Sequence, residues 1–505
     1  MTQRRIGILL SYINLVAKNL VTFIYTPILL RFLGQSEYGL YQMANSVITS
    51  LLLLNLGLGS AYIRFYAIYN KNEKSRKQDI ANLNGMYLIL FFIISTLSLV
   101  IGVLLSQNID ILFQKSLSVS ELKTMRYLMI LMVINISISF PSSLFDSYIV
   151  AHEQFKFQRS RQLFQTIITP LLTIPLLLFG LRSISIIVVQ TAVTLFFFFL
   201  NISFATKKLE MKFLFLRFDK KLLYEILSFS FFIFLNQIID QINWNLPNFL
   251  LGVLQGAKQV AIFAVANQIK NIFITLSTTL SGVFVPEINE IVSTTDDNFR
   301  LTQIMTRIGR LQMIILVYVL GGFLVLGKYF ILVWAGEEYN DVFIISLLLI
   351  IPFVITLIQN TGYEIIRAKN MHQFRATIEF LFALLNIFLT FSFIKLFGVV
   401  GSAIGTAITT IAVSGFIMNW YYHYKVGLNM HYFWNQILRI LPLFIIPTVI
   451  LYLCNVVSPV DNVMLFVLYG LIYSGIFVVC FYKLISTDEE RKVLEVVINK
   501  FRRNK

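Results

Sequence analysis

Several lysine and amide side chains lie inside long apolar segments, where charged residues are rare. Lys18 lies beside Asn14 and Asn19 in the first such segment, and Lys270 lies beside Asn267 in a later one. A charged side chain at the centre of a bilayer costs at least about 2.5–3.5 kcal/mol on insertion scales, so it usually faces a bundle interior or a wet cavity. Lysines at that depth have the chemistry to bind an anion such as a diphosphate.

The most polar stretch within an apolar segment reads Asn-Gln-Ile-Ile-Asp-Gln-Ile-Asn-Trp-Asn and covers 236–245. Its amides and the Trp244 ring suit contacts with sugar hydroxyls and ring faces. Asp240 suits either a coupling-ion site or a structural partner, and a Lys18–Asp240 ion pair would need no ligand. The candidate cavity polar or coupling residues are Asp240, Asn236, Gln237, Asn243, Trp244, Asn19, Asn267 and Glu364.

Further cations lie near the ends of apolar segments. Each can line a cavity and bind an anion, or extend its charged head to the membrane interface. We favour cavity lining for the two lysines and extension to the interface for the arginines. The candidate cavity cations are Lys18, Lys270, Arg64, Arg310, Arg31 and Arg367.

The sequence lacks the usual signs of catalysis or metal binding. Its four histidines form no metal-ligand pair, and Cys454 and Cys480 lie in apolar segments, as packing residues do. No glycine-rich phosphate loop is followed by a lysine, so an ATPase is excluded. The segments between apolar runs are too short for a soluble catalytic domain. We therefore expect no enzyme and no cofactor beyond a coupling ion, H⁺ or Na⁺.

The elements that position these residues are transmembrane helices. Apolar residues make up 57% of the chain and charged residues 13%, against about 25% charged in soluble domains. Apolar runs of at least about 18 residues recur throughout, which predicts an all-α polytopic membrane protein with about 14 transmembrane helices. The expected spans are 8–33, 38–68, 83–105, 122–150, 160–181, 183–205, 221–250, 257–286, 304–333, 342–366, 374–396, 399–424, 433–456 and 462–483.

The net charge of +16 is unevenly distributed between alternate loops. The positive-inside rule then places both termini in the cytoplasm, and the placement argues against nucleic acid as a partner. The loop near 287–303 mixes acids with Arg300 and does not indicate a side. The basic set comprises Arg4, Arg5, Lys71, Lys74, Arg76, Lys77, Lys156, Arg159, Arg161, Lys207, Lys208, Lys212, Arg217, Lys220, Lys221, Arg367, Lys369, Arg375 and the tail to Lys505.

The chain contains an internal repeat. The segment 34–45 aligns with 256–267, with Gly, an aromatic residue, Ala and Asn in register, and Pro27 matches Pro247 across a two-residue gap. The offset pairs helices one to six with helices seven to twelve. An even number of spans leaves both halves in the same orientation, so we expect parallel repeats, an arrangement that transporters use. The expected domains are 1–205 as N-lobe (helices 1–6), 206–220 as cytoplasmic linker, 221–425 as C-lobe (helices 7–12), and 426–505 as helices 13–14 with a cytoplasmic tail.

One motif resembles a known family. The stretch Tyr25-Thr-Pro-Ile-Leu-Leu-Arg-Phe-Leu-Gly-Gln-Ser-Glu-Tyr-Gly-Leu-Tyr41 is similar to the first helix pair of the bacterial polysaccharide (O-antigen or capsule repeat-unit) flippases. These belong to the multidrug/oligosaccharidyl-lipid/polysaccharide exporter superfamily. The resemblance implies transport of undecaprenyl-diphosphate-linked oligosaccharide repeat units by alternating access between two six-helix lobes with a cationic cavity. It also implies a groove for the polyprenyl tail on helices 13 and 14, as in related lipid II flippases. We expect the motif at 25–41 to have an architectural role, that is, to support the fold.

Other functions compete with this interpretation. A cation-coupled multidrug extruder of the same fold would favour acidic residues in its cavity. In this sequence the cationic candidates at least match the acidic ones. A membrane glycosyltransferase or polysaccharide polymerase would need a larger loop, and a structural scaffold would not need charges within the membrane. The expected location is the bacterial cytoplasmic (inner) membrane. The expected partners are the lipid-linked oligosaccharide, membrane lipids, and a polysaccharide polymerase with its assembly proteins.

Overall fold

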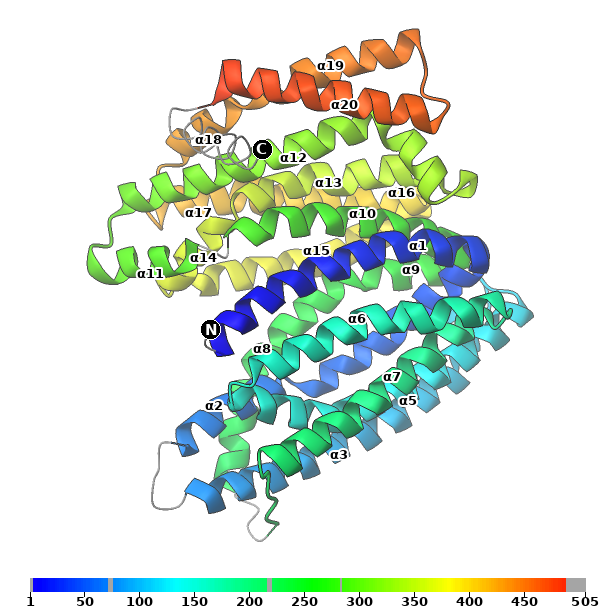
Figure 1. Ribbon diagram of the computed structural model, residues 1–505, viewed down its shortest axis with the longest axis vertical. Helices are drawn as coiled ribbons and strands as arrows, with labels where there is room; N and C mark the ends of the chain where they lie inside the picture. Colours follow the sequence, from blue (N-terminus) through cyan, green and yellow to red (C-terminus); the bar gives the residue numbers. More distant parts are fainter. Residues whose placement is uncertain (1–2, 71–75, 216–219, 282–283, 487–505) are drawn as a thin grey trace, which may run out of the picture. The chain divides into compact units, whose positions relative to one another are not determined.

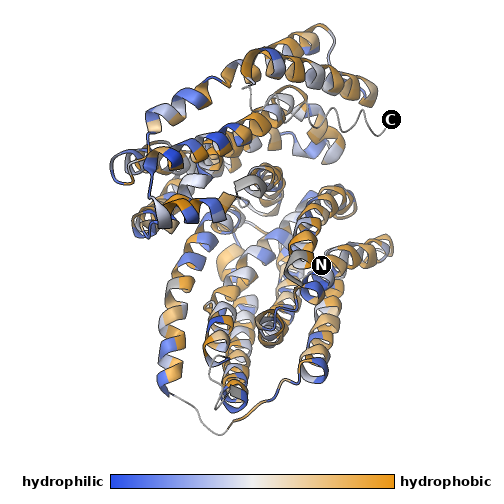
Figure 2. Cartoon of the chain, turned by 60° about the vertical axis from the view of Figure 1, so that its left-hand side comes forward, coloured by the Kyte–Doolittle hydropathy of each residue, from blue (hydrophilic) through white to orange (hydrophobic). Residues whose placement is uncertain are grey.

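The protein is helical throughout the part of the chain that the structure describes. The computed structural model describes residues 3–70, 76–215, 220–281 and 284–486, and no strand occurs among them (Figure 1). Apolar residues cover most of the long helices (Figure 2). These observations confirm the predicted all-α polytopic fold. The expected cytoplasmic tail beyond 486 and the basic residues Lys71, Lys74 and Arg217 lie outside the described residues.

The number of membrane spans agrees with the sequence once the first helix is divided. Among the described residues, 12 helices are long and apolar enough to cross a membrane, or up to 13 with one bent pair. The first of these, Ile6–Tyr69, has 64 residues. At 1.5 Å per residue it is roughly three times as long as the bilayer core is thick, so it has room for both expected spans, 8–33 and 38–68.

The helices group into two compact units, which we describe separately. Unit 1 comprises Met1–Ala264 and Ile394–Val399. Its central helix is α5, which carries many buried side chains and packs against α1, α2, α3 and α7. The elements of unit 1 are α1 (Gln3–Thr49), η1 (Ser50–Asn55), α2 (Leu58–Tyr69), α3 (Arg76–Gln107), α4 (Ile109–Phe113), α5 (Val119–Ala151), α6 (Phe155–Leu178), α7 (Arg182–Ser203), η2 (Phe204–Lys208), α8 (Lys220–Trp244), α9 (Leu246–Gln255) and the start of α10 (Ala257–Ser281).

Unit 2 comprises Val265–Phe393 and Val400–Lys505. Its central helix is α12, which packs against α13, α18, α19 and α20. Its elements are the rest of α10, α11 (Val285–Thr294), α12 (Asn298–Trp334), η4 (Glu337–Tyr339), α13 (Val342–Ile358), α14 (Asn360–Ala368), α15 (His372–Phe397), α16 (Val399–Thr410), η5 (Ile411–Ile417), α17 (Met418–Tyr424), α18 (Met430–Leu438), α19 (Leu441–Val457), α20 (Val463–Cys480) and η6 (Phe481–Ile485). The division into lobes at 206–220 stays a prediction.

Several expected spans are interrupted where the sequence suggested continuous helix. The span 38–68 is broken by the 3₁₀ turn η1 and by Gly57, which has φ 71°. The span 221–250 ends at Trp244, and Pro247 lies in the first turn of the next helix, where a missing N–H costs nothing. The span 342–366 bends by 42° between α13 and α14. The loop expected at 287–303 largely belongs to helices α11 and α12.

The aligned repeats share one unusual backbone conformation. Gly34 has φ 72° and ψ 171°, and Gly256 has φ 84° and ψ −176°. This region is open essentially to glycine alone. Gly34 interrupts α1 after Pro27, and Gly256 directly follows α9, which contains Pro247. The local geometry therefore agrees with the repeat alignment, and it places the break in α1 at Gly34 rather than at the proline.

The motif 25–41 ties helix ends together within unit 1. The carboxylate of Glu37 accepts hydrogen bonds from the backbone N–H and the hydroxyl of Ser183 (2.9 and 2.6 Å), at the start of α7. Ser36 donates to Glu121 (2.6 Å) in the first turn of α5. Gly39 permits close approach, because a Cβ there would lie 1.9 Å from the main-chain oxygen of Ala257. These contacts agree with the expected architectural role.

Candidate functional site

The candidate residues divide between the two units. Unit 2 holds Asn267, Lys270, Arg310, Glu364 and Arg367, and unit 1 holds the others, on α1, α2 and α8. Within each unit, different helices contribute. A single cavity lined by both sets stays a prediction, and so do the roles of the individual side chains as ligands.

On α1, the candidates differ in exposure. Lys18 and Arg31 are exposed, as cavity lining or extension to the interface would require. Asn19 is half-buried, and its amide donates to Leu15 O of the preceding turn (2.9 Å). Asn14, beside it, donates to the main-chain oxygen of Arg159 (2.8 Å) and so joins α1 to α6.

The polar stretch of α8 is partly exposed. Asn236 and Asp240 are exposed, and Trp244 is 37% exposed. Gln237 and Asn243 are half-buried. Because amides, a carboxylate and an indole come from one helix, the stretch can offer both hydrogen bonds and a ring face to a hydroxyl-rich ligand.

Arg64 joins two elements of unit 1. Its guanidinium lies 4.4 Å from the centre of the Phe229 ring, so a residue of α2 packs on α8. The same two segments also fit closely at Gly57, because a Cβ there would lie 2.4 Å from Ile233 Cγ2. This contact uses the ring face and leaves guanidinium N–H groups able to bind an anion.

Lys270 is buried within unit 2. It is 3% exposed, and its Nζ lies 5.1 Å from the centre of the Phe353 ring on α13. A cation over an aromatic face is stabilised by the ring quadrupole. A substrate that binds Lys270 would therefore have to reach a side chain packed between α10 and α13.

Arg310 is buried and linked to the C-terminal helices. Its guanidinium donates to Gln436 O (3.1 Å) and to Ile485 O (3.2 Å). It is 7% exposed, and its extension to the membrane interface stays a prediction. Arg367 is exposed and Glu364 half-buried, both on the short helix α14.

The structure adds a polar pocket in unit 2 that the sequence did not reveal. The Arg375 Nε donates to Glu379 (2.6 Å), and the Arg375 guanidinium lies 3.8 Å from the centre of the Tyr363 ring. This pair lines a cavity of about 20 Å³ together with Gln359 and Ser414. That is room for about one water-sized occupant.

Two helix breaks face this unit-2 polar pocket. Gln359 lies at the bend between α13 and α14, and Ser414 lies in the π-helical segment η5. Asn419 links them, because it accepts from Gln359 (3.2 Å) and donates to Ser414 O (2.7 Å). Broken helices and π turns are common at functional sites. The bend at Gln359 could have been suspected from Pro352, whereas nothing in the sequence marks the π turn.

Comparisons with solved structures show the fold. A structure of the lipid II flippase MurJ in an inward closed conformation has TM-score 0.75 and 16% identity, and the match covers 94% of this chain and 99% of that chain. An inward-facing multidrug resistance MATE transporter of the MOP superfamily has TM-score 0.58 and 15% identity, covering 82% and 97%. The Vibrio cholerae MATE transporter VcmN has TM-score 0.56 and 12% identity, covering 84% and 99%.

Sequence comparison identifies the family. No curated protein matches the chain. The sequence model described as polysaccharide biosynthesis protein matches residues 6–292, which is more than half of the chain and includes the motif at 25–41. This family and the exporter fold agree with the resemblance that the motif indicated. The chain belongs to the polysaccharide biosynthesis protein family, and it is a multi-pass membrane protein with the fold of MOP-superfamily transporters.

Proposed function

We propose that the protein is a flippase that moves undecaprenyl-diphosphate-linked oligosaccharide repeat units across the bacterial cytoplasmic membrane. It acts by alternating access and supplies the synthesis of a surface polysaccharide such as O-antigen or capsule. The observation that carries this proposal is the match to the polysaccharide biosynthesis family over residues 6–292. Both termini are proposed to lie in the cytoplasm.

The fold and the polar residues support transport rather than chemistry. The match to the lipid II flippase structure covers 94% of this chain, and its name gives lipid II as what that protein moves. Lysine, arginine and amide side chains on apolar helices offer an anion and a hydroxyl-rich ligand the contacts that they need. In this proposal the protein catalyses no bond cleavage, and a coupling ion, H⁺ or Na⁺, supplies the energy. A polymerase and assembly proteins use the product.

The test is a deletion strain. Its surface polysaccharide is stained, and lipids are extracted from its inner membrane. Loss of surface polymer with lipid-linked repeat units accumulating on the cytoplasmic side is the expected result. Loss of polymer without that accumulation would overturn the proposal, because a polymerase or a glycosyltransferase defect produces a different set of intermediates.

A multidrug extruder is the second candidate, and the MATE structures favour it. Their fold matches this chain with TM-scores of 0.58 and 0.56. If this were the function, the deletion strain would keep its surface polymer and become more sensitive to cationic drugs.

A further inference from the structure

The segment after η2 is attached along one face of α3. Leu214 N donates to Ala81 O (2.9 Å), and the Asn84 amide donates to Lys212 O (2.8 Å). Gly85 makes the approach possible, because a Cβ there would lie 2.0 Å from Leu214 O. The Asn84 side chain is itself held by the Tyr62 hydroxyl. Backbone contacts therefore fix this non-helical segment up to Phe215.

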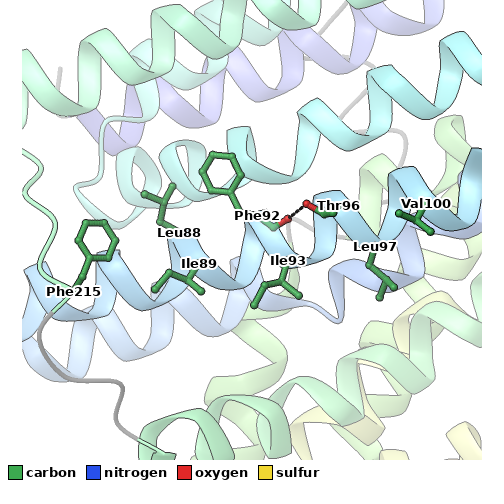
Figure 3. A pocket seen from close by; sticks show the side chains of 8 residues that line it. All are labelled: Leu88, Ile89, Phe92, Ile93, Thr96, Leu97, Val100 and Phe215. Carbon is green, nitrogen blue, oxygen red and sulfur yellow. Dashed lines mark hydrogen bonds between the residues drawn. The ribbon is translucent and has the colours of Figure 1, made fainter.

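An apolar groove begins where this segment ends. Phe215 lies at one end of it, and the exposed face of α3 from Leu88 to Val100 forms its length (Figure 3). Its volume is about 620 Å³. The one hydroxyl in its lining, that of Thr96, donates to Phe92 O (3.0 Å) and so presents its methyl group. The occupant must therefore be a hydrocarbon, since no free donor or acceptor side chain is offered to a sugar or a phosphate.

The groove has the length of one leaflet. Val100 is twelve positions after Leu88, which is about 18 Å of α-helix at 1.5 Å per residue. Half of a bilayer core is about 15 Å. A phospholipid acyl chain spans one leaflet, whereas an eleven-unit prenyl chain is far longer. The length thus favours an acyl chain over the tail of the proposed substrate.

Lysines mark the end of the groove next to Phe215. Lys77 lies one turn before Ala81, on the same face of α3, and Lys212 is the residue whose carbonyl Asn84 binds. Both lysine side chains are exposed. Cations beside the surface attract anionic headgroups. The charge at this end complements the headgroup of an anionic lipid whose chain lies along the groove.

From this geometry we infer that α3 and the 209–215 segment form a binding site for an anionic phospholipid. Its acyl chain lies between Phe215 and Val100, and its phosphate lies at Lys77 and Lys212. The site is separate from the candidate transport residues and does not depend on the proposed function. It anchors a specific lipid to the segment that connects α7 with α8.

The test is native mass spectrometry of the detergent-purified full-length protein. Phosphatidylglycerol or phosphatidylcholine with identical acyl chains is titrated, and retained adducts are counted. The wild type should retain phosphatidylglycerol preferentially. Lys77→Gln and Lys212→Gln should each weaken that preference about fivefold. Lys258→Gln, an exposed lysine at the start of α10, is the control and should not change it.

A second variant tests the groove. Ile93→Trp should fill it and lower retention of both lipids, whereas Leu171→Trp on α6 should not; the two native side chains are 57% and 58% exposed. Equal retention of the two lipids by the wild type, or equal effects of the two tryptophans, would overturn the site. Displacement of phosphatidylglycerol by an equimolar amount of undecaprenyl phosphate would also overturn it, in favour of a prenyl chain. Helix content and elution volume confirm that each variant is folded.

Discussion

The guanidinium of Arg310 joins two chain segments that are far apart in sequence, because it donates to the main-chain oxygens of Gln436 and Ile485 at 3.1 and 3.2 Å. These carbonyls lie near the end of α18 and at the end of η6. Residues from the C-terminal helices are thereby attached to the central helix α12 within unit 2. A residue chosen from the sequence as a cavity cation therefore has a structural role as well.

Replacing Arg310 by methionine should lower stability. The change leaves two carbonyls without these donors, at a cost of about 1–3 kcal/mol in unfolding free energy. Thermal unfolding of the detergent-purified protein measures this effect. Arg310→Lys, which keeps the charge and a donor, should lose less. Unchanged unfolding temperatures with reduced export would instead assign Arg310 to substrate binding.

Replacing Gly39 by alanine should prevent correct folding. The new Cβ would lie 1.9 Å from Ala257 O, and a backbone atom cannot move aside cheaply. Gly470→Ala in α20 is the matched control, because nothing lies within 4 Å of its Cβ. That change should stabilise α20 by about 0.5–1 kcal/mol. The measurement is the monodisperse fraction after size exclusion. Similar yields for the two variants would contradict the close approach.

Replacing Glu37 by alanine should destabilise unit 1 by about 1–2 kcal/mol. Its carboxylate caps the start of α7 by accepting from the N–H and hydroxyl of Ser183, and Arg182 lies 3.5 Å away. Glu37→Gln retains an acceptor and should lose about half as much. Thermal unfolding of the three proteins in detergent tests this order. Equal stability of the alanine and glutamine variants would show that the cap does not depend on a side-chain acceptor.

Replacing Lys18 or Lys270 by alanine should impair export of surface polysaccharide while folded protein stays in the membrane. Each change removes a cation proposed to bind the substrate diphosphate. Arginine at either position should retain part of the activity. Complementation of the deletion strain, with polymer staining and a membrane blot, measures both. Normal export by the Lys18→Ala/Lys270→Ala double variant would assign these lysines to structure.

The positions of the helix breaks show which parts of the fold could be predicted from the sequence. Long apolar runs predicted nearly every span, and α6 and α7 are separated at Gly180, with φ 83°, near the expected boundary between spans 160–181 and 183–205. The break at Gln359 and the π turn 411–417 were missed, because the contacts of Asn419 that accompany them form only in the folded chain: its side chain accepts from the Gln359 amide and donates to Ser414 O. Propensity within one segment carries no such information.

The sequence by itself determined the membrane class, the approximate spans, the repeat signature and the family motif, because apolar length and glycine conformation are local properties. Only the tertiary structure decided what surrounds each polar residue. Lys270 packs under Phe353, Arg310 binds two distant carbonyls, and Arg375 pairs with Glu379 beside Tyr363. Arg375 and Glu379 lie four residues apart on α15, and the Tyr363 ring reaches this pair from another helix. The partners of Lys270 and Arg310 come from other helices, so the pattern of one helix shows that a charge lies in the membrane but not which group compensates it.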